Sequence, residues 1–223
     1  LEYRTFPACF SLESQRSLEA SGVTRLRRQP TFNLRGQGVL VGIIDTGIDY
    51  THPAFINQDG STKIYAIWDQ TIEGDNYPEA AGYGTQYFAQ DINRALNSDD
   101  PLSIVPSTDE IGHGTMLAGI AAGSVIDESQ FSGVAPDAEL VVVKLKQAKK
   151  SIRKFLFIPD DVPCYQENDI MWAFQYIVDM AASLNRPVAI CIGLGSSQGS
   201  HAGLGPLSSL VTIGADFSGV VAA

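Results

Sequence analysis

Apolar runs of strand length alternate along this chain with stretches in which apolar residues recur at helical spacing. Two of the runs, Val39–Ile44 and Val188–Ile192, contain no charged residue, which is typical of strands buried on both faces of a parallel sheet. The predicted strands lie at 38–44, 63–68, 139–145, 187–192 and 219–223, and the predicted helices at 11–20, 88–96, 113–122, 167–184 and 206–213. This alternation predicts an α/β fold, a doubly wound and mostly parallel sheet with helices on both faces.

The first predicted core strand ends on an acidic residue. Asp45 follows the apolar run and precedes Thr46 and Gly47, so it is expected at the carboxyl end of a buried strand. Open α/β sheets build their ligand sites at those ends. A half-buried carboxylate costs free energy unless a donor or an opposite charge partners it. Asp45 is therefore a candidate functional residue in need of a partner.

His113 is the candidate partner of Asp45. It is flanked by glycines and begins a stretch with helical spacing, in which the expected buried residues are Met116, Leu117, Ile120 and Ala121. His113 is thus expected in the first turn of a buried helix. The positive end of the helix dipole disfavours an imidazolium there, so a nearby carboxylate would stabilise the protonated form of a general base. We expect Asp45 to supply that carboxylate.

The same residues allow three other interpretations. An Asp at a strand end often bonds its own backbone in a turn. Asp-Thr-Gly is also the signature of aspartic proteases, which need two carboxylates, but the tripeptide occurs once and the helical patterns disfavour an all-β fold. Gly193 and Gly195 follow a strand, as in a dinucleotide-binding loop, but the third glycine, Gly199, comes one residue late and opens no helical pattern.

Together, the two motifs resemble those of the subtilisin-like serine proteases, or subtilases. That family carries its triad in the chain order Asp, His, Ser, and here Asp45–Gly47 precedes His113–Thr115. Gly133–Pro136 is similar to a further step of the family after the His helix. The resemblance implies that Asp45 is the orienting acid of a catalytic triad and that His113 is its general base.

A glycine-rich segment extends the resemblance. Gly193, Leu194 and Gly195 match the subtilase segment that pairs backbone to backbone with an extended peptide. Small residues suit this role because a closely approaching substrate strand leaves no room for side chains. The resemblance therefore implies that these three residues bind substrate, with a simple glycine turn as the alternative. The implied partners are a protein or peptide substrate in extended conformation and the protein's own propeptide.

The family's nucleophile motif, Gly-Thr-Ser-Met-Ala, does not occur in these 223 residues, nor does its oxyanion Asn. No serine near the C-terminal end has a nucleophile context; these are Ser196, Ser197, Ser200, Ser208 and Ser209. We therefore expect these residues to be a catalytic domain truncated before the part that carries the nucleophile. We expect this fragment to be inactive alone, and its full-length parent to be a serine endopeptidase. The alternative is a pseudoprotease that acts as a binding or signalling scaffold.

The resemblance also suggests a domain organisation. Residues 1–35 are expected to form an N-terminal arm and residues 36–223 the N-terminal part of the catalytic domain. The segment at about 56–110 is long for a linker between the two motifs, and we expect an insertion that packs on the rim of the active-site cleft. Three segments resemble the clostridial subtilases that include spore-germination proteases: Asp109–His113, Phe157–Pro163 and Asn168–Met171. This subgroup favours an extracellular or spore-associated protein.

Composition narrows the possible partners. The formal net charge of −10 argues against nucleic acid or an anionic membrane, and no apolar stretch reaches the length of a membrane span. Cys9, Cys164 and Cys191 are too sparse for a disulfide framework or a zinc cluster. Ala54 stands where many subtilases have a calcium-binding Asp, so we expect no metal and no cofactor. The basic residues within 144–154 are expected to form a solvated face.

Overall fold

The computed structural model describes residues 20–27, 29, 31, 34–126, 131–195 and 202–223. The chain divides into two compact units, Leu1–Leu34 and Arg35–Ala223. The described part of the first unit contains the short helix α2 (Val23–Arg27). The helix predicted at 11–20 lies, except for Ala20, outside the described residues.

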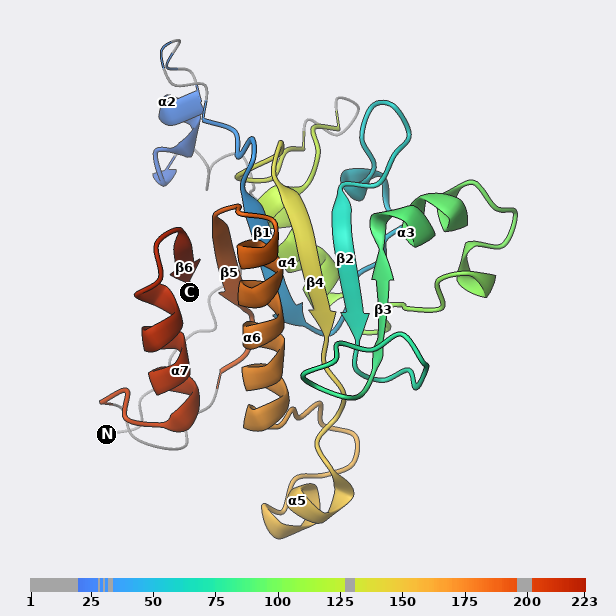
Figure 1. Cartoon of the computed structure of the whole chain (residues 1–223), viewed down its shortest axis with the longest axis vertical. Helices are drawn as coiled ribbons and strands as arrows, with labels where there is room; N and C mark the ends of the chain where they lie inside the picture. Colours follow the sequence, from blue (N-terminus) through green and yellow to red (C-terminus); the bar gives the residue numbers. More distant parts are fainter. Residues whose placement is uncertain (1–19, 28, 30, 32–33, 127–130, 196–201) are drawn as a thin grey trace, which may run out of the picture. The chain divides into compact units, whose positions relative to one another are not determined.

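The second unit is built on a six-stranded sheet with the order β3-β2-β4-β1-β5-β6 (Figure 1). The strands are β1 (Leu40–Asp45), β2 (Ile64–Asp69), β3 (Thr85–Phe88), β4 (Glu139–Lys144), β5 (Val188–Ile192) and β6 (Val220–Ala222). All neighbouring strands run parallel except β2 and β3. Every residue of β1 is buried, because β1 lies in the middle of the sheet and is covered on both faces. The predicted parallel sheet is confirmed.

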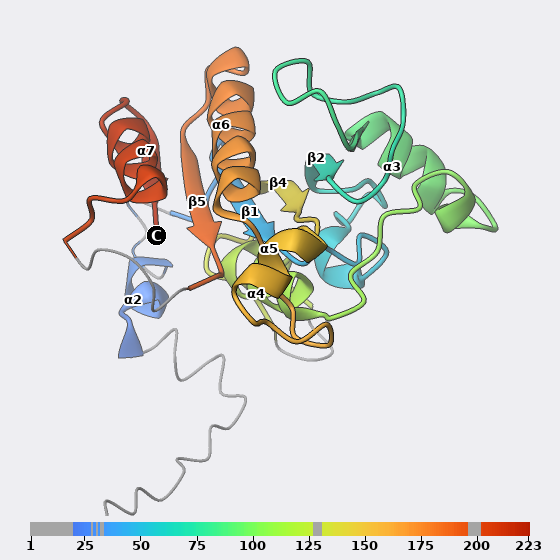
Figure 2. The ribbon, with the colours of Figure 1, turned by 90° about the horizontal axis from the view of Figure 1, so that it is seen from below.

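Helices cover both faces of this sheet (Figures 1 and 2). Helix α4 (His113–Ala122) shares a core cluster with Ile43, and helix α6 (Glu167–Ser183) shares the opposite cluster with Ile44. Successive strand residues point to opposite faces, so these two neighbours place the two helices on opposite sides. The remaining helices are α3 (Ala89–Leu96), α5 (Lys150–Phe155) and α7 (Pro206–Ala215), with short 3₁₀ turns at Pro53–Phe55 and Pro101–Ser103.

Helix α4 packs through a different face from the one predicted. Met116 and Ile120, expected in the core, are 47% and 49% exposed. The buried residues are instead Gly114, Ala118, Gly119 and Ala122. The first, second and fourth of these follow an i, i+4, i+8 row that meets the sheet. A row without large side chains lets the helix approach the strands closely. Close packing of these small residues therefore decided which face of α4 is buried, although Met116 and Ile120 are more hydrophobic.

The segment at 56–110 is not confined to a rim. Strand β2 pairs in parallel with β4 and is almost entirely buried, and Trp68 is 0% exposed. Strand β3 then adds the antiparallel edge of the same sheet. The expectation of a rim insertion is therefore wrong for these strands. The strand predicted at 63–68 is confirmed, and the rest of the fold covers both of its faces.

The predicted solvated basic face is also wrong for two of its members, Lys144 and Arg153, which are buried. The guanidinium of Arg153 donates to Gln147 Oε1 at 3.1 Å and to the carbonyl of Val162 at 2.6 Å. These bonds link Arg153 in α5 to the chain segments before and after this helix. Long basic side chains can bury their stems and charges when backbone acceptors converge on them.

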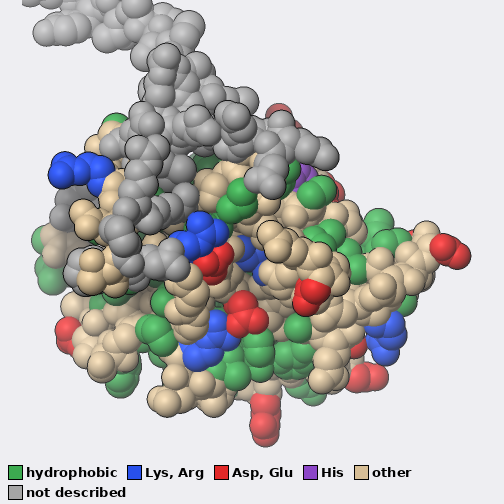
Figure 3. All heavy atoms as spheres, turned by 90° about the horizontal axis from the view of Figure 1, so that it is seen from above, with side chains coloured by type: hydrophobic (Ala, Val, Ile, Leu, Met, Phe, Trp, Pro, Cys, Tyr) green, Lys and Arg blue, Asp and Glu red, His purple; other side chains and the backbone are tan. Residues whose placement is uncertain are grey.

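The amino ends of the strands are held by ion pairs. Arg35 pairs with Asp137 at 2.7 Å, and Arg186 pairs with Glu139 at the start of β4. Figure 3 looks onto this edge and shows acidic and basic side chains next to one another among apolar ones. In parallel α/β sheets the opposite edge, where the strands end, builds the ligand sites. A ligand site is therefore expected at the carboxyl ends of the strands.

Candidate active site

Asp45 is the last residue of β1, and its side chain is 0% exposed. Its Oδ1 accepts a hydrogen bond from the backbone N–H of Thr46 at 2.7 Å and lies 2.8 Å from Nδ1 of His113. Its Oδ2 is buried and has no hydrogen-bond partner among the described residues. The bond to Thr46 is the one that the turn interpretation expects. The turn interpretation does not account for the contact with His113, 68 residues away, which the partner interpretation predicts.

His113 is the first residue of α4 and contacts Asp45 at the carboxyl end of β1. A carboxylate can only accept, so the contact with Asp45 requires a proton on Nδ1 of the imidazole. A neutral ring then carries its lone pair on Nε2. The side chain remains 41% exposed, so the ring stays accessible while Asp45 is completely buried. In this tautomer Nε2 can act as a proton acceptor.

Glycines allow the start of α4 to reach Asp45. A Cβ atom at Gly114 would lie 2.3 Å from the carbonyl oxygen of Gly47 and 3.1 Å from Cβ of Asp45. Gly112, at the N-cap, has a φ of 81°, a conformation that favours glycine. The glycines on either side of His113 therefore serve distinct purposes, one a backbone turn and the other a close helix contact.

We expect Gly114→Ala to destabilise the protein by about 1–3 kcal/mol, the range for overpacking, because the new methyl group meets backbone that cannot yield. Gly119→Ala is the matched control in the same helix, since the nearest atom to its Cβ would be Phe131 Cζ at 3.7 Å. That control should stabilise by about 0.5–1 kcal/mol through helix propensity. Urea denaturation measures both changes, and equal shifts of the same sign would contradict the close contact at Gly114.

The loop before α4 is tied to the ends of two neighbouring strands. Lys144, the last residue of β4, donates to the carbonyl of Thr108 at 2.7 Å and pairs with Glu110 at 2.9 Å. Asp69, the last residue of β2, accepts from the Ser107 hydroxyl at 2.6 Å. Sequence reasoning missed both roles. The available signal was the one used for Asp45, a charged residue that closes an apolar strand.

The predicted substrate segment lies beside the pair. Gly193 directly follows β5, and a Cβ atom there would lie 2.2 Å from Oδ2 of Asp45 and 2.2 Å from Cδ1 of Leu117. Leu194 is partly buried against the core cluster of α6, and Gly195 is exposed with open space around it. The next helix in the described part of the chain is α7, which begins at Pro206, and Gly199 lies outside that part.

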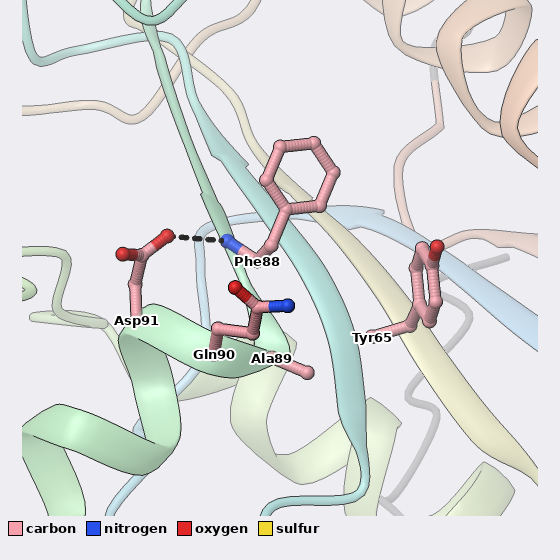
Figure 4. A pocket seen from close by; sticks show the side chains of 5 residues that line it. All are labelled: Tyr65, Phe88, Ala89, Gln90 and Asp91. Atoms are coloured by element: carbon pink, nitrogen blue, oxygen red, sulfur yellow. Dashed lines mark hydrogen bonds between the residues drawn. The ribbon is translucent and has the colours of Figure 1, made fainter.

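A metal site, a disulfide or a pocket could also mark a functional site in the described residues. Within them, no group of three or more His, Cys, Asp or Glu side chains is placed to hold a metal ion. Cys164 and Cys191 are free thiols, while Cys9 is outside the described part. A pocket of about 270 Å³ lies at the start of α3, lined by Tyr65, Phe88, Ala89, Gln90 and Asp91 (Figure 4), and includes neither Asp45 nor His113. No helix in the described ranges is long and apolar enough to cross a membrane.

Comparison with known proteins supports the subtilase resemblance. A sequence model of the Subtilase family matches residues 36–157, which is more than half of the chain and contains both Asp45 and His113. A subtilisin-like protease of Arabidopsis thaliana, SBT2.2, is 35% identical over 133 residues, which cover 51% of this chain and 15% of the relative. Subtilisin from Bacillus sp. (strain TA39) is 28% identical over 162 residues, covering 73% of this chain and 28% of the relative.

A solved structure agrees in fold. The Clostridium perfringens CspB protease superposes with a TM-score of 0.76 and 31% identity, covering 93% of this chain and 39% of that one. This match is consistent with the clostridial subgroup indicated by the sequence. The chain spans less than a third of the matched curated relatives. From the family match, the order of the Asp and His motifs and the parallel sheet that carries them, the chain belongs to the subtilase family.

Proposed function

We propose that this chain is the N-terminal part of a subtilisin-like serine endopeptidase in which Asp45 and His113 are two members of the catalytic triad. The observation that carries the proposal is the 2.8 Å contact between Asp45 Oδ1 and His113 Nδ1. It joins a fully buried carboxylate to an accessible imidazole at the carboxyl ends of the central strands. Membership of the subtilase family supports the same roles.

In the proposed reaction, a serine supplied by sequence outside these 223 residues attacks the carbonyl carbon of the scissile peptide bond. His113 Nε2 takes the hydroxyl proton as the C–O bond forms, and later gives it to the leaving amine as the C–N bond breaks. Asp45 holds the Nδ1–H tautomer and stabilises the imidazolium between those two transfers. The amino terminus of α4 makes this stabilisation more necessary, since its dipole disfavours a positive ring.

We further propose that an extended protein or peptide substrate lies along Gly193, Leu194 and Gly195. The position of Gly193 against Asp45 Oδ2 supports this, because a bound strand at that segment comes close to the reacting groups. The exposed Gly195 leaves backbone free for pairing. The protein's own propeptide would occupy the same track. An intact Asp45–His113 pair supports the peptidase over the pseudoprotease alternative.

The proposal predicts activity in the full-length protein and none in this chain alone. Loss of the nucleophile removes most of the catalysis by a triad, and loss of one oxyanion donor lowers turnover by about 10²–10³. The measurement is cleavage of a chromogenic peptide by each purified protein, with and without a serine-directed covalent inhibitor. We expect inhibitor-sensitive cleavage only from the full-length protein. Inhibitor-sensitive cleavage by the 223-residue chain, or an inactive full-length protein, would contradict the proposal.

A further inference from the structure

The geometry points to Asp109 as a positioning residue that holds His113 against Asp45. Asp109 lies four residues before His113, and among the described residues no hydrogen bond joins its carboxylate to the imidazole. Its importance for catalysis rests on the proposed function, whereas its effect on the placement of His113 can be measured without any activity.

Four hydrogen bonds converge on the Asp109 carboxylate. Oδ1 accepts from the Thr46 hydroxyl at 2.7 Å and from the backbone N–H of Gly112 at 2.9 Å. Oδ2 accepts from the backbone N–H of Thr115 at 2.9 Å and from the Thr115 hydroxyl at 2.7 Å. The acceptor sites of both oxygens are thus used by groups from β1's exit loop and from the start of α4.

Most of these donors belong to residues that are next to Asp45 or His113 in the sequence. Thr46 is the residue after Asp45, and its hydroxyl oxygen also accepts from the N–H of Gly114 at 2.9 Å. Gly112 and Gly114 are the covalent neighbours of His113. The carboxylate of Asp109 therefore ties the segment that carries the acid to the segment that carries the base, and the two side chains meet across this tie.

The carboxylate also does the work of a missing helix cap. The N-cap residue of α4 is Gly112, which has no side chain to accept from the free N–H groups of the first turn. Asp109 accepts from the N–H of Thr115 instead, and its negative charge suits the positive end of the helix. Its charge is available at neutral pH, because burial is outweighed by the bonds from Thr115, Thr46 and Gly112, which hold the pKa of Asp109 below its usual value.

The tie differs from the other contacts of the same loop. Glu110, the next residue, pairs with Lys144 and accepts from Thr108, so it holds the loop against β4. Among the described residues its side chain has no hydrogen bond to Thr46 or α4. Glu110→Gln removes one negative charge from the same loop, as Asp109→Asn does. It leaves all four bonds of Asp109 in place, which makes Glu110→Gln a matched control.

The test uses the full-length protein labelled with ¹⁵N-histidine, and the Nδ1–H signal of His113 is assigned by its loss in a His113→Gln variant. We expect Asp109→Asn to raise the rate of exchange of that proton with water about tenfold, the factor expected from the loss of one charge-assisted hydrogen bond. The amide nitrogen cannot accept, so the backbone N–H of Gly112 or that of Thr115 loses its acceptor, depending on which oxygen the nitrogen replaces. Glu110→Gln should leave the exchange rate unchanged.

Two outcomes would overturn the role of Asp109: an unchanged exchange rate in Asp109→Asn, or equal changes in Asp109→Asn and Glu110→Gln. If Asp109→Asn does not fold, Thr46→Val replaces it, with Thr46→Ser as the control that keeps the hydroxyl. Faster exchange in the valine variant alone supports the tie, and equal rates contradict it. A wild-type protein without any Nδ1–H signal from His113 would instead contradict the contact with Asp45, and with it the proposed function.

Discussion

Replacing Asp45 by asparagine in the full-length protein is expected to lower turnover by about 10⁴, the effect of the same change in the chymotrypsin triad. Asp45 Oδ1 contacts Nδ1 of His113 at 2.8 Å and is held by the N–H of Thr46. An amide group placed there can donate to Nδ1, which moves the imidazole proton to Nε2. The ring then cannot accept the proton of the serine. The measurement is the turnover number on a chromogenic peptide.

The control for this variant is Asp59→Asn. Asp59 accepts from the N–H and the hydroxyl of Ser61 in an exposed turn, so the substitution also removes one negative charge without touching the pair. Turnover of this control should equal that of the wild type. A wild-type rate in Asp45→Asn would rule out the proposed role of Asp45, provided that thermal denaturation shows a folded variant.

The largest expected loss of stability comes from Trp68→Ala, at about 3–5 kcal/mol. Trp68 is 0% exposed, and its indole N–H donates to the carbonyl of Tyr83 at 3.1 Å. Its ring packs at tilted angles against Tyr83 and Tyr176, at centroid distances of 5.3 and 5.2 Å. Truncation removes these contacts, opens a cavity between β2 and α6, and leaves the carbonyl of Tyr83 without its donor.

Urea denaturation of the purified protein measures this loss, and Tyr77→Ala is the control from the same stretch of chain. Tyr77 is exposed, so its truncation should change the free energy of unfolding by less than about 0.5 kcal/mol. The comparison distinguishes a sheet strand from a rim insertion. Similar small changes in both variants would mean that β2 is not an integral part of the core.

The sequence alone was sufficient for the central strands and for the candidate pair. Long apolar runs can be buried only between two layers, so β1, β4 and β5 could be predicted as strands of a parallel sheet within one or two residues. An acid closing the first strand and a glycine-flanked histidine opening a helix were enough to predict that Asp45 and His113 would meet. Both features are local, and a parallel sheet brings strand ends and helix starts to one edge.

The buried face of α4 could not be predicted from the sequence, because it depends on how the helix packs against the sheet. The pattern of α4 contained a large apolar stripe and a small-residue row, and only the packed structure shows that Gly114, Ala118 and Ala122 meet the sheet while Met116 and Ile120 remain exposed. Close approach was worth more than the burial of larger side chains.

Tertiary structure also decided which charged residues are buried. Lys144, which was expected on a solvated face, is buried, and Asp109 is partly buried. The carbonyl of Thr108 and the hydroxyl of Thr46, both distant in the sequence, contact their charged groups. A charge can be buried only where such partners are assembled, and sequence spacing does not specify that assembly. The composition and order of the chain thus determined the sheet and its Asp–His pair, while three-dimensional convergence of donors decided what holds the pair in place.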